Sequence, residues 1–129
     1  MSRVLLDTHA FLWFVFDDRR LSSRADTLIG DSDNEVLLSI ASLWEITIKA
    51  QLDKLTLGMP VEVFFRRYVE QRRLALVDVQ VAHLVAYGQL PLLHRDPFDR
   101  LLVAQAQVLG VPILSSDSKL EPYGVPILW

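Results

Sequence analysis

The chain has 129 residues, of which 51% are hydrophobic, and its formal net charge is −3. This length suits a single domain over residues 1–129, and the apolar content is sufficient for a hydrophobic core. Cysteine is absent, which excludes a disulfide scaffold, a thiolate zinc site and a cysteine nucleophile. An acidic residue, Asp7, interrupts the first apolar run far short of a signal peptide or a membrane span, so we expect a soluble, cytoplasmic protein that does not contact membranes.

The net negative charge at first argues against a nucleic-acid partner, because phosphate binding usually leaves a basic surface. Carboxylates that converge on divalent ions reverse the local sign, however, since the bound metal attracts phosphate. Basic residues also cluster, at Arg19-Arg20, Arg66-Arg67 and Arg72-Arg73. These pairs are either a solvated face or a contact surface for RNA or another partner.

Short runs rich in Val, Ile and Leu indicate buried strands at residues 4–6, 36–39 and 111–114. Residues 74–79 and 125–129 form two weaker candidates. A proline near the start of a strand is tolerated at its first position or on a sheet edge. The sequence therefore predicts about five strands.

Segments with helical spacing lie between these runs, at residues 39–52, 61–73 and 97–109. The last segment is followed by Gly110, which is typical of a helix C-terminus. Alternating strands and helices predict parallel strands with right-handed crossovers, hence an α/β fold with helices on both faces of an open sheet. In such sheets ligands bind beyond the carboxyl ends of the strands.

Two aspartates come at the ends of predicted strands. Asp7 directly follows the first strand, and Asp117 comes shortly after the fourth strand along the chain. Both carboxylates should border one cleft, because the carboxyl ends of parallel strands share an edge. The alternative for each is an ordinary helix N-cap or Asx turn, which is the commonest role of an aspartate after a strand.

Two further acids lie on predicted helices. Glu45 either pairs with Lys49 on the helix surface or points, half-buried, into the cleft beside the small residues Ala41 and Ser42. Asp99 lies three residues after Asp96, and we interpret Asp96 as the N-cap of that helix, followed by proline in the first position. Asp99 is then placed in the first helical turn, close to the strand ends.

Four unpaired carboxylates in one place would repel one another strongly, and a cation resolves this conflict. Oxygen ligands without a Cys or clustered His pattern favour Mg²⁺, with Mn²⁺ as the alternative, over zinc. Such an ion lowers the pKa of bound water and holds a scissile phosphate. The three histidines, His9, His83 and His94, do not show metal-site spacing and are interpreted as structural or supporting residues.

The aromatic run at residues 11–16 is more apolar than a surface helix requires. Core packing is the simpler interpretation, and a groove for a partner or for self-association is the alternative.

Three segments together resemble the PIN-domain ribonucleases, and among them the VapC-like toxins of bacterial type II toxin–antitoxin systems. They are Leu5-Leu6-Asp7-Thr8-His9 with Leu12-Trp13, the stretch from Ser39 to Lys49, and His94-Arg95-Asp96-Pro97-Phe98-Asp99-Arg100 continuing to Ala106. Leu114-Ser115-Ser116-Asp117 occupies the place of the family's closing acidic motif. The segments span nearly the whole chain in the expected order.

The resemblance implies a three-layer α/β/α PIN-like domain with a central parallel sheet of four or five strands. It also implies that Asp7, Glu45, Asp99 and Asp117 form a catalytic quartet. Asp7 and Asp99 would ligate the metal directly, Asp117 would complete the site or hold a second ion, and Glu45 would ligate the ion or orient the attacking water. Ser115 matches a position where the family often has a hydroxyl residue near the site, and it would contact substrate.

By the same resemblance we expect a Mg²⁺-dependent endoribonuclease toxin that hydrolyses RNA with metal-activated water, forms a homodimer and is silenced by an antitoxin protein. The aromatic residues 11–16 and Trp44 would line the antitoxin groove. Two departures stand out: Asp53 replaces a common glycine after the Glu45 helix, and Asp96 adds a fifth nearby acid.

Two other functions stay open at this point. The first is a phosphohydrolase with Asp7 as covalent nucleophile, although such enzymes usually carry a second acid two residues later, where this chain has His9. The second is a catalytically silent domain that binds a partner.

Overall fold

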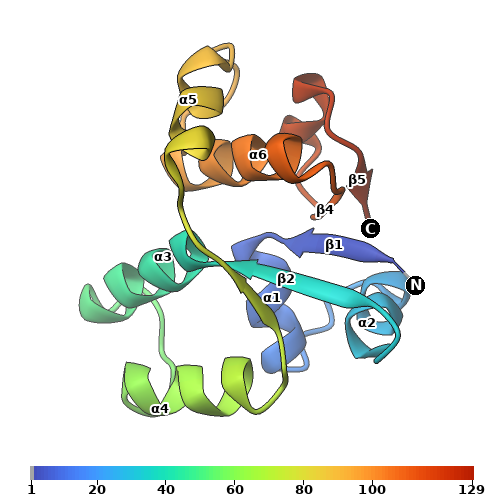
Figure 1. The fold of residues 1–129 in the computed structure, drawn as a ribbon. Helices are drawn as coiled ribbons and strands as arrows, with labels where there is room; N and C mark the ends of the chain where they lie inside the picture. The colour runs from blue at the N-terminus through green and yellow to red at the C-terminus, as the bar shows by residue number, and fades with distance from the viewer. Residues whose placement is uncertain (1) are drawn as a thin grey trace.

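The computed structural model describes residues 2–129, in which five short strands form one all-parallel sheet (Figure 1). The sheet order is β3-β2-β1-β4-β5, so the first strand of the chain lies at the centre. Each predicted apolar run contains one strand. The strands are β1 (Arg3–Leu6), β2 (Glu35–Ser39), β3 (Ala75–Val77), β4 (Ile113–Leu114) and β5 (Ile127–Leu128).

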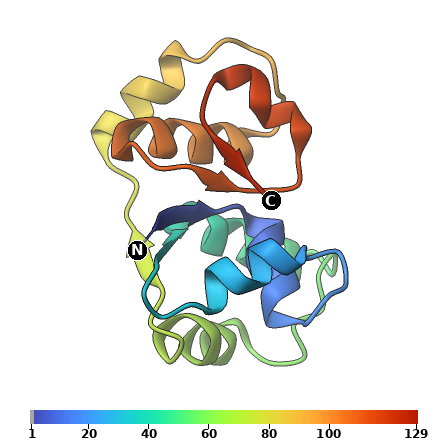
Figure 2. The same ribbon diagram turned by 90° about the vertical axis from the view of Figure 1, so that its right-hand side faces the viewer.

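Helices cover both faces of the sheet, which confirms the predicted three-layer α/β/α architecture. Figure 2 shows the sheet between a layer that contains α5 and α6 and a second layer that contains α1 to α4. The helices are α1 (Thr8–Val15), α2 (Ser23–Gly30), α3 (Ile40–Gln51), α4 (Val61–Phe65), α5 (Val81–Gln89) and α6 (Pro97–Leu109), with a π-helical turn η1 (Arg66–Glu70) and a 3-10 helix η2 (Ser118–Tyr123).

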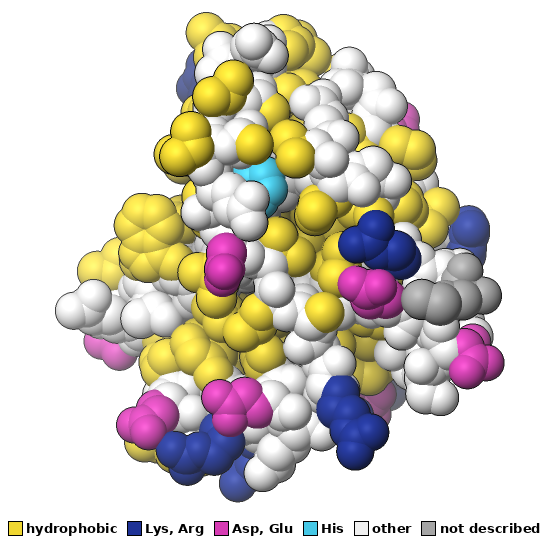
Figure 3. Space-filling model, in the orientation of Figure 1, with side chains coloured by type: hydrophobic (Ala, Val, Ile, Leu, Met, Phe, Trp, Pro, Cys, Tyr) yellow, Lys and Arg dark blue, Asp and Glu magenta, His cyan; other side chains and the backbone are white. Residues whose placement is uncertain are grey.

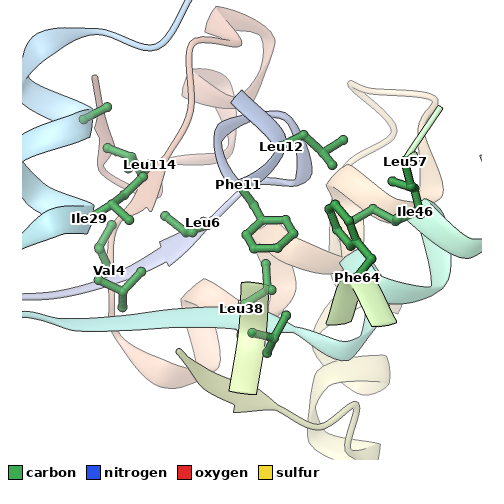
Figure 4. Close-up of a cluster of buried hydrophobic side chains, with 13 residues drawn as sticks. Val4, Leu6, Phe11, Leu12, Ile29, Leu38, Ile46, Leu57, Phe64 and Leu114 are labelled. Atoms are coloured by element: carbon green, nitrogen blue, oxygen red, sulfur yellow. The ribbon is translucent and has the colours of Figure 1, made fainter. Parts of the chain in front are cut away.

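Two hydrophobic cores lie on the two sides of the sheet, because successive strand residues point to opposite faces. Leu6 of β1 packs with Phe11 of α1 and Phe64 of α4, and the rings of Phe11 and Phe64 meet edge to face (Figure 4). Leu5 belongs to the other core, with the apolar side of α6. Phe11 is fully buried, so core packing is confirmed for this member of the aromatic run.

The prediction of one helix over residues 61–73 was wrong in its second half. The segment begins as α4, changes to the π-helical turn η1 and ends at Glu70. Arg73 has a left-handed backbone with φ of 57°, which a continuing α-helix does not allow. The turn redirects the chain into β3.

Asp53, the residue that departs from the expected glycine, also has a left-handed backbone, with φ of 56°. Glycine adopts this conformation without steric cost, and aspartate is among the few other residues that tolerate it. The turn after α3 therefore has the backbone shape that a glycine would give.

None of the helices in residues 2–129 combines the length and the apolar character needed to cross a lipid bilayer.

Candidate metal centre and active site

The strand order reverses between β1 and β4, which is the place where open parallel sheets bind ligands. The two strands pair in parallel, Leu5 opposite Ile113 and Leu6 opposite Leu114. Asp7 follows β1 and donates its backbone N–H to the Leu114 carbonyl at 3.1 Å. The loop that carries Asp117 follows β4, which runs parallel to β1. Both aspartates therefore lie at the carboxyl ends of the strands, as predicted.

Asp7 is the N-cap of α1 and is 5% exposed. Its Oδ1 accepts the Ala10 N–H at 2.6 Å. Burial raises the pKa of Asp7 above its ordinary range, and the charge of Asp117 raises it further, whereas the Ser115 hydroxyl, the Ala10 amide and His9 lower it. The capping role is therefore real, and it uses one carboxylate oxygen while the other can serve a cation.

Asp99 lies in the first turn of α6, and the pKa of its carboxyl is raised to about 7. Burial is the largest cause, followed by the negative charges of Asp96, Asp7 and Glu45, while His94 acts in the opposite direction. Acids from three separate segments of the chain thus act on one another electrostatically around Asp99. They carry more negative charge than the surrounding residues neutralise.

Asp117 caps η2 by accepting the Lys119 N–H at 3.0 Å through Oδ1. Its Oδ2 lies 3.2 Å from Nε2 of His94, and the same nitrogen lies 3.4 Å from Asp99 Oδ2. Ligand atoms of these three residues all lie within 4.8 Å of one another. This trio has the spacing that a single metal ion requires.

Glu45 on α3 fulfils both interpretations of the sequence. Its Oε2 forms an ion pair with Lys49 at 2.8 Å, one helical turn away, and yet the residue is only 3% exposed. Its Oε1 is buried and meets no hydrogen-bond donor within residues 2–129. A buried acceptor without a donor is costly, so this oxygen needs water or an ion.

Ser115 is buried beside the two strand-end aspartates. Its Oγ accepts the Asp117 N–H at 3.0 Å, and its hydroxyl lowers the pKa of the neighbouring Asp7 carboxyl. The assignment of Ser115 to substrate binding stays a prediction. Its contacts favour a role in orienting Asp7 and Asp117 instead.

Asp96 is the N-cap of α6, as predicted. Its Oδ1 accepts the N–H groups of Phe98 at 2.8 Å and Asp99 at 3.3 Å, and Pro97 occupies the first helical position. Both hydrogen bonds use Oδ1, and they agree with the interpretation of Asp96 as a helix cap.

His94 is the residue whose proximity to the acids the sequence did not indicate. Its neighbour in the site, Asp117, is 23 residues away along the chain, and no spacing pattern connects them. A second unpredicted contact joins Thr8 and Ser42, whose buried hydroxyls hydrogen bond at 2.9 Å between α1 and α3. His83 is buried and bonds to the Gln80 backbone, which agrees with a structural role.

The residues fit a divalent cation. The raised pKa values of Asp7 and Asp99 and the unsatisfied Glu45 oxygen all indicate missing positive charge. The donors are mainly carboxylate oxygens, the type that Mg²⁺ and Mn²⁺ prefer.

An apolar groove borders the acids between α3 and the start of α6. Trp44, which is 60% exposed, meets Phe98 edge to face at 5.3 Å between ring centroids, and Phe98 lines the groove. Lys49 and Arg95 also line it and bring positive charge close to the carboxylates.

Three other arginines do not line this groove. Arg72 and Arg73 line a pocket together with Asn34. Asn34 directly precedes β2, so this pocket lies at the amino ends of the strands, away from the acids. Arg100 is buried with its guanidinium 4.6 Å from the centre of the Tyr87 ring.

Comparison with known proteins gives three results. A model of the PIN domain family matches residues 4–125. The chain is 29% identical over 126 residues to Ribonuclease VapC22 from Mycobacterium tuberculosis. The matched region covers 98% of this chain and 95% of that protein.

Solved structures with the same fold include VapBC2 from Rickettsia felis, bound to a DNA fragment from its promoter, with a TM-score of 0.74, 14% identity and 98% of each chain covered. VapBC-1 from nontypeable Haemophilus influenzae has a TM-score of 0.68 and 14% identity, with coverage of 98% of this chain and 97% of that chain.

Proposed function

The chain belongs to the PIN domain family, and from that premise we propose that it is a Mg²⁺-dependent endoribonuclease, the toxin of a toxin–antitoxin pair. The observation that carries the proposal is the convergence of Asp7, Glu45, Asp99 and Asp117 from two strand ends and two helices. The similarity to a protein named as a ribonuclease supports RNA as the substrate.

Asp7, Asp99 and Asp117 would hold the ion, with Mn²⁺ as an alternative to Mg²⁺. When bound, the ion supplies an activated water molecule and offsets the charge of the scissile phosphate. Glu45 has one oxygen neutralised by Lys49, and its buried Oε1 would accept a hydrogen bond from the attacking water. Lys49 and Arg95 in the adjoining groove would bind neighbouring phosphates of the RNA.

Cleavage of labelled RNA by the purified protein, with Mg²⁺ and with a chelator, tests the activity. We expect Asp7→Asn and Asp99→Asn each to reduce the rate by at least about 100-fold, since each removes charge from the metal centre. Asp26→Asn, in the exposed first turn of α2, is the matched control and should cleave like wild type.

Equal cleavage by wild type and Asp7→Asn would overturn the proposal. Rapid hydrolysis of a phosphomonoester with an acyl-phosphate on Asp7 would instead favour the phosphohydrolase alternative. Failure to bind Mn²⁺ at any accessible concentration would favour a silent binding domain.

An antitoxin is the second part of the proposal, supported by structural neighbours named VapBC2 and VapBC-1, since the sequence resembles the VapC-like toxins of toxin–antitoxin pairs. The groove beside Trp44 and Phe98 is apolar and adjoins the acids, so a segment bound there would also block them. Co-expression with the product of a short neighbouring reading frame tests this. We expect Trp44→Ala to weaken the complex by at least about 30-fold if Trp44 is a central anchor.

We also infer a homodimer, because α5 exposes apolar side chains that no other element covers in residues 2–129. Figure 3 shows hydrophobic side chains gathered over α5 at the top of this face. Val81, Leu84 and Val85 are each more than half exposed on this helix, and Leu92 and Leu93 follow it. A contiguous apolar surface of this kind is typical of an interface.

A further inference from the structure

The imidazole of His94 lies between two of the carboxylates that would hold the cation. Its Nε2 is 3.2 Å from Asp117 Oδ2 and 3.4 Å from Asp99 Oδ2. The His94 side chain is only 12% exposed, and His94 lies in the segment between α5 and α6. The backbone N–H of His94 donates to the Tyr123 hydroxyl at 2.9 Å, which ties this segment to η2.

The second ring nitrogen determines what Nε2 can do. Nδ1 of His94 accepts the backbone N–H of Asp96 at 3.1 Å. A neutral imidazole carries one proton, and a nitrogen that accepts a hydrogen bond does not carry it. The proton is therefore on Nε2, which donates toward Asp99 and Asp117.

This arrangement is the reverse of a metal-binding histidine. A ligating imidazole presents a bare nitrogen to the metal and donates its other ring N–H to a carbonyl or carboxylate. His94 instead presents its N–H to the carboxylates and its bare nitrogen to a backbone amide. The three ligand atoms have suitable spacing for a metal, but the proton position makes His94 a hydrogen-bond donor.

We propose that His94 is a positioning residue, and that its Nε2–H occupies the position beside Asp99 Oδ2 and Asp117 Oδ2 that the cation would take. Without an ion, its Nε2–H donates to Asp117 Oδ2, and the same nitrogen lies 3.4 Å from Asp99 Oδ2. An ion that binds both Oδ2 atoms must displace this hydrogen bond, so His94 competes with the metal. The competition rests on the proposed metal-dependent function, whereas the contact between His94 and Asp117 does not depend on it.

Calorimetric titration with Mn²⁺ at one neutral pH tests the competition in the full chain. We expect His94→Ala to bind Mn²⁺ about tenfold more tightly than wild type, because a charge-assisted hydrogen bond no longer has to be broken. His94→Gln is the matched variant: its amide can donate from the position of Nε2, and we expect affinity close to wild type. Binding weakened by about tenfold or more in both variants would show that His94 is a ligand and would overturn the proposal. Unchanged affinity in His94→Ala would also overturn it.

Imidazole ¹⁵N NMR of the metal-free wild-type chain provides a test that needs neither metal nor a folded variant. We expect a protonated Nε2 and an unprotonated Nδ1 at His94, and the same tautomer after addition of Mg²⁺. A proton on Nδ1 in either state would overturn the proposal. If the expected tautomer is found and wild type binds no Mn²⁺, the pairing stands and the proposed metal dependence fails.

Discussion

Asp99 retains a proton more readily than an ordinary aspartate, because it is buried among other acids. In the unfolded chain the same carboxyl has its ordinary pKa near 3.8, whereas in the metal-free fold the pKa is about 7. The folded state therefore binds more protons than the unfolded state between these two values, and the free energy of unfolding must fall as the pH rises.

We predict that the metal-free protein loses stability between about pH 4 and pH 7 through Asp99. Thermal unfolding in the presence of a chelator, from pH 4 to pH 8, measures this, and Asp99→Asn should reduce the slope because its amide does not titrate. Mg²⁺ should raise the melting temperature most at the upper end, where the carboxylates are charged. A pH dependence identical in wild type and Asp99→Asn would contradict the prediction.

A second prediction concerns Ser115, which contacts both strand-end aspartates. Ser115→Ala should lower Mn²⁺ affinity by about tenfold, because the carboxylates lose a group that orients them. It should also destabilise the fold by about 1 kcal/mol. Calorimetry and thermal unfolding measure the two effects, and Ser23→Ala, at an exposed position in α2, should change neither. Normal metal affinity in Ser115→Ala would argue against the orienting role.

The individual elements show which parts of the fold are encoded locally. The α6 helix matches its predicted range of residues 97–109 at both ends, because Asp96 caps its start and Gly110, with φ of 68°, ends it. The five strands were recognisable as short apolar runs. By contrast, α2 buries only Ala25 and Ile29, so its apolar pattern is too sparse to indicate a helix.

The candidate site was predictable to the same extent. Asp7, Glu45, Asp99 and Asp117 each mark a strand end or a helix position that the pattern of hydrophobic residues already defines. His94 was interpreted only as structural or supporting, because its contact with Asp117, 23 residues away along the chain, exists only in the folded sheet.

Asp53 gives a prediction about the turn after α3. Asp53→Gly should raise the free energy of unfolding by about 0.5 to 1 kcal/mol, because glycine relieves the cost of a left-handed backbone. Chemical denaturation of both proteins measures the difference. Asp31→Gly provides a comparison, since Asp31 has a negative φ of −78° and should not gain stability. A loss of stability in Asp53→Gly would mean that the aspartate side chain contributes more than the backbone costs.

In the whole molecule, the site requires all three layers at once. Glu45 comes from the helical layer of α1 to α4, Asp99 from the layer of α5 and α6, and Asp7 and Asp117 from the edge of the sheet between them. A shift of one helical layer against the other would separate Glu45 from Asp99. The acids are therefore close only in the completed fold.

The exposed face of α5 leads to a prediction about assembly. Val85→Asp should convert a dimer to a monomer, because it places a charge within the apolar surface formed with Val81 and Leu84. Light scattering after size-exclusion chromatography measures the mass. Gln107→Asp, at a polar position of α6, is the control and should leave the mass unchanged. A wild-type protein that is monomeric at high concentration would contradict the inferred homodimer.

The central position of β1 has a consequence for how the protein is made. β1 has β4 as one of its two neighbours in the sheet, and β4 follows β1 along the chain only after β2, β3 and all six α-helices. Asp117 follows β4, so a nascent chain carries Asp7 long before it can complete the acidic cluster. A site that needs both aspartates therefore cannot assemble until β4 and Asp117 have been synthesised and β4 has paired with β1.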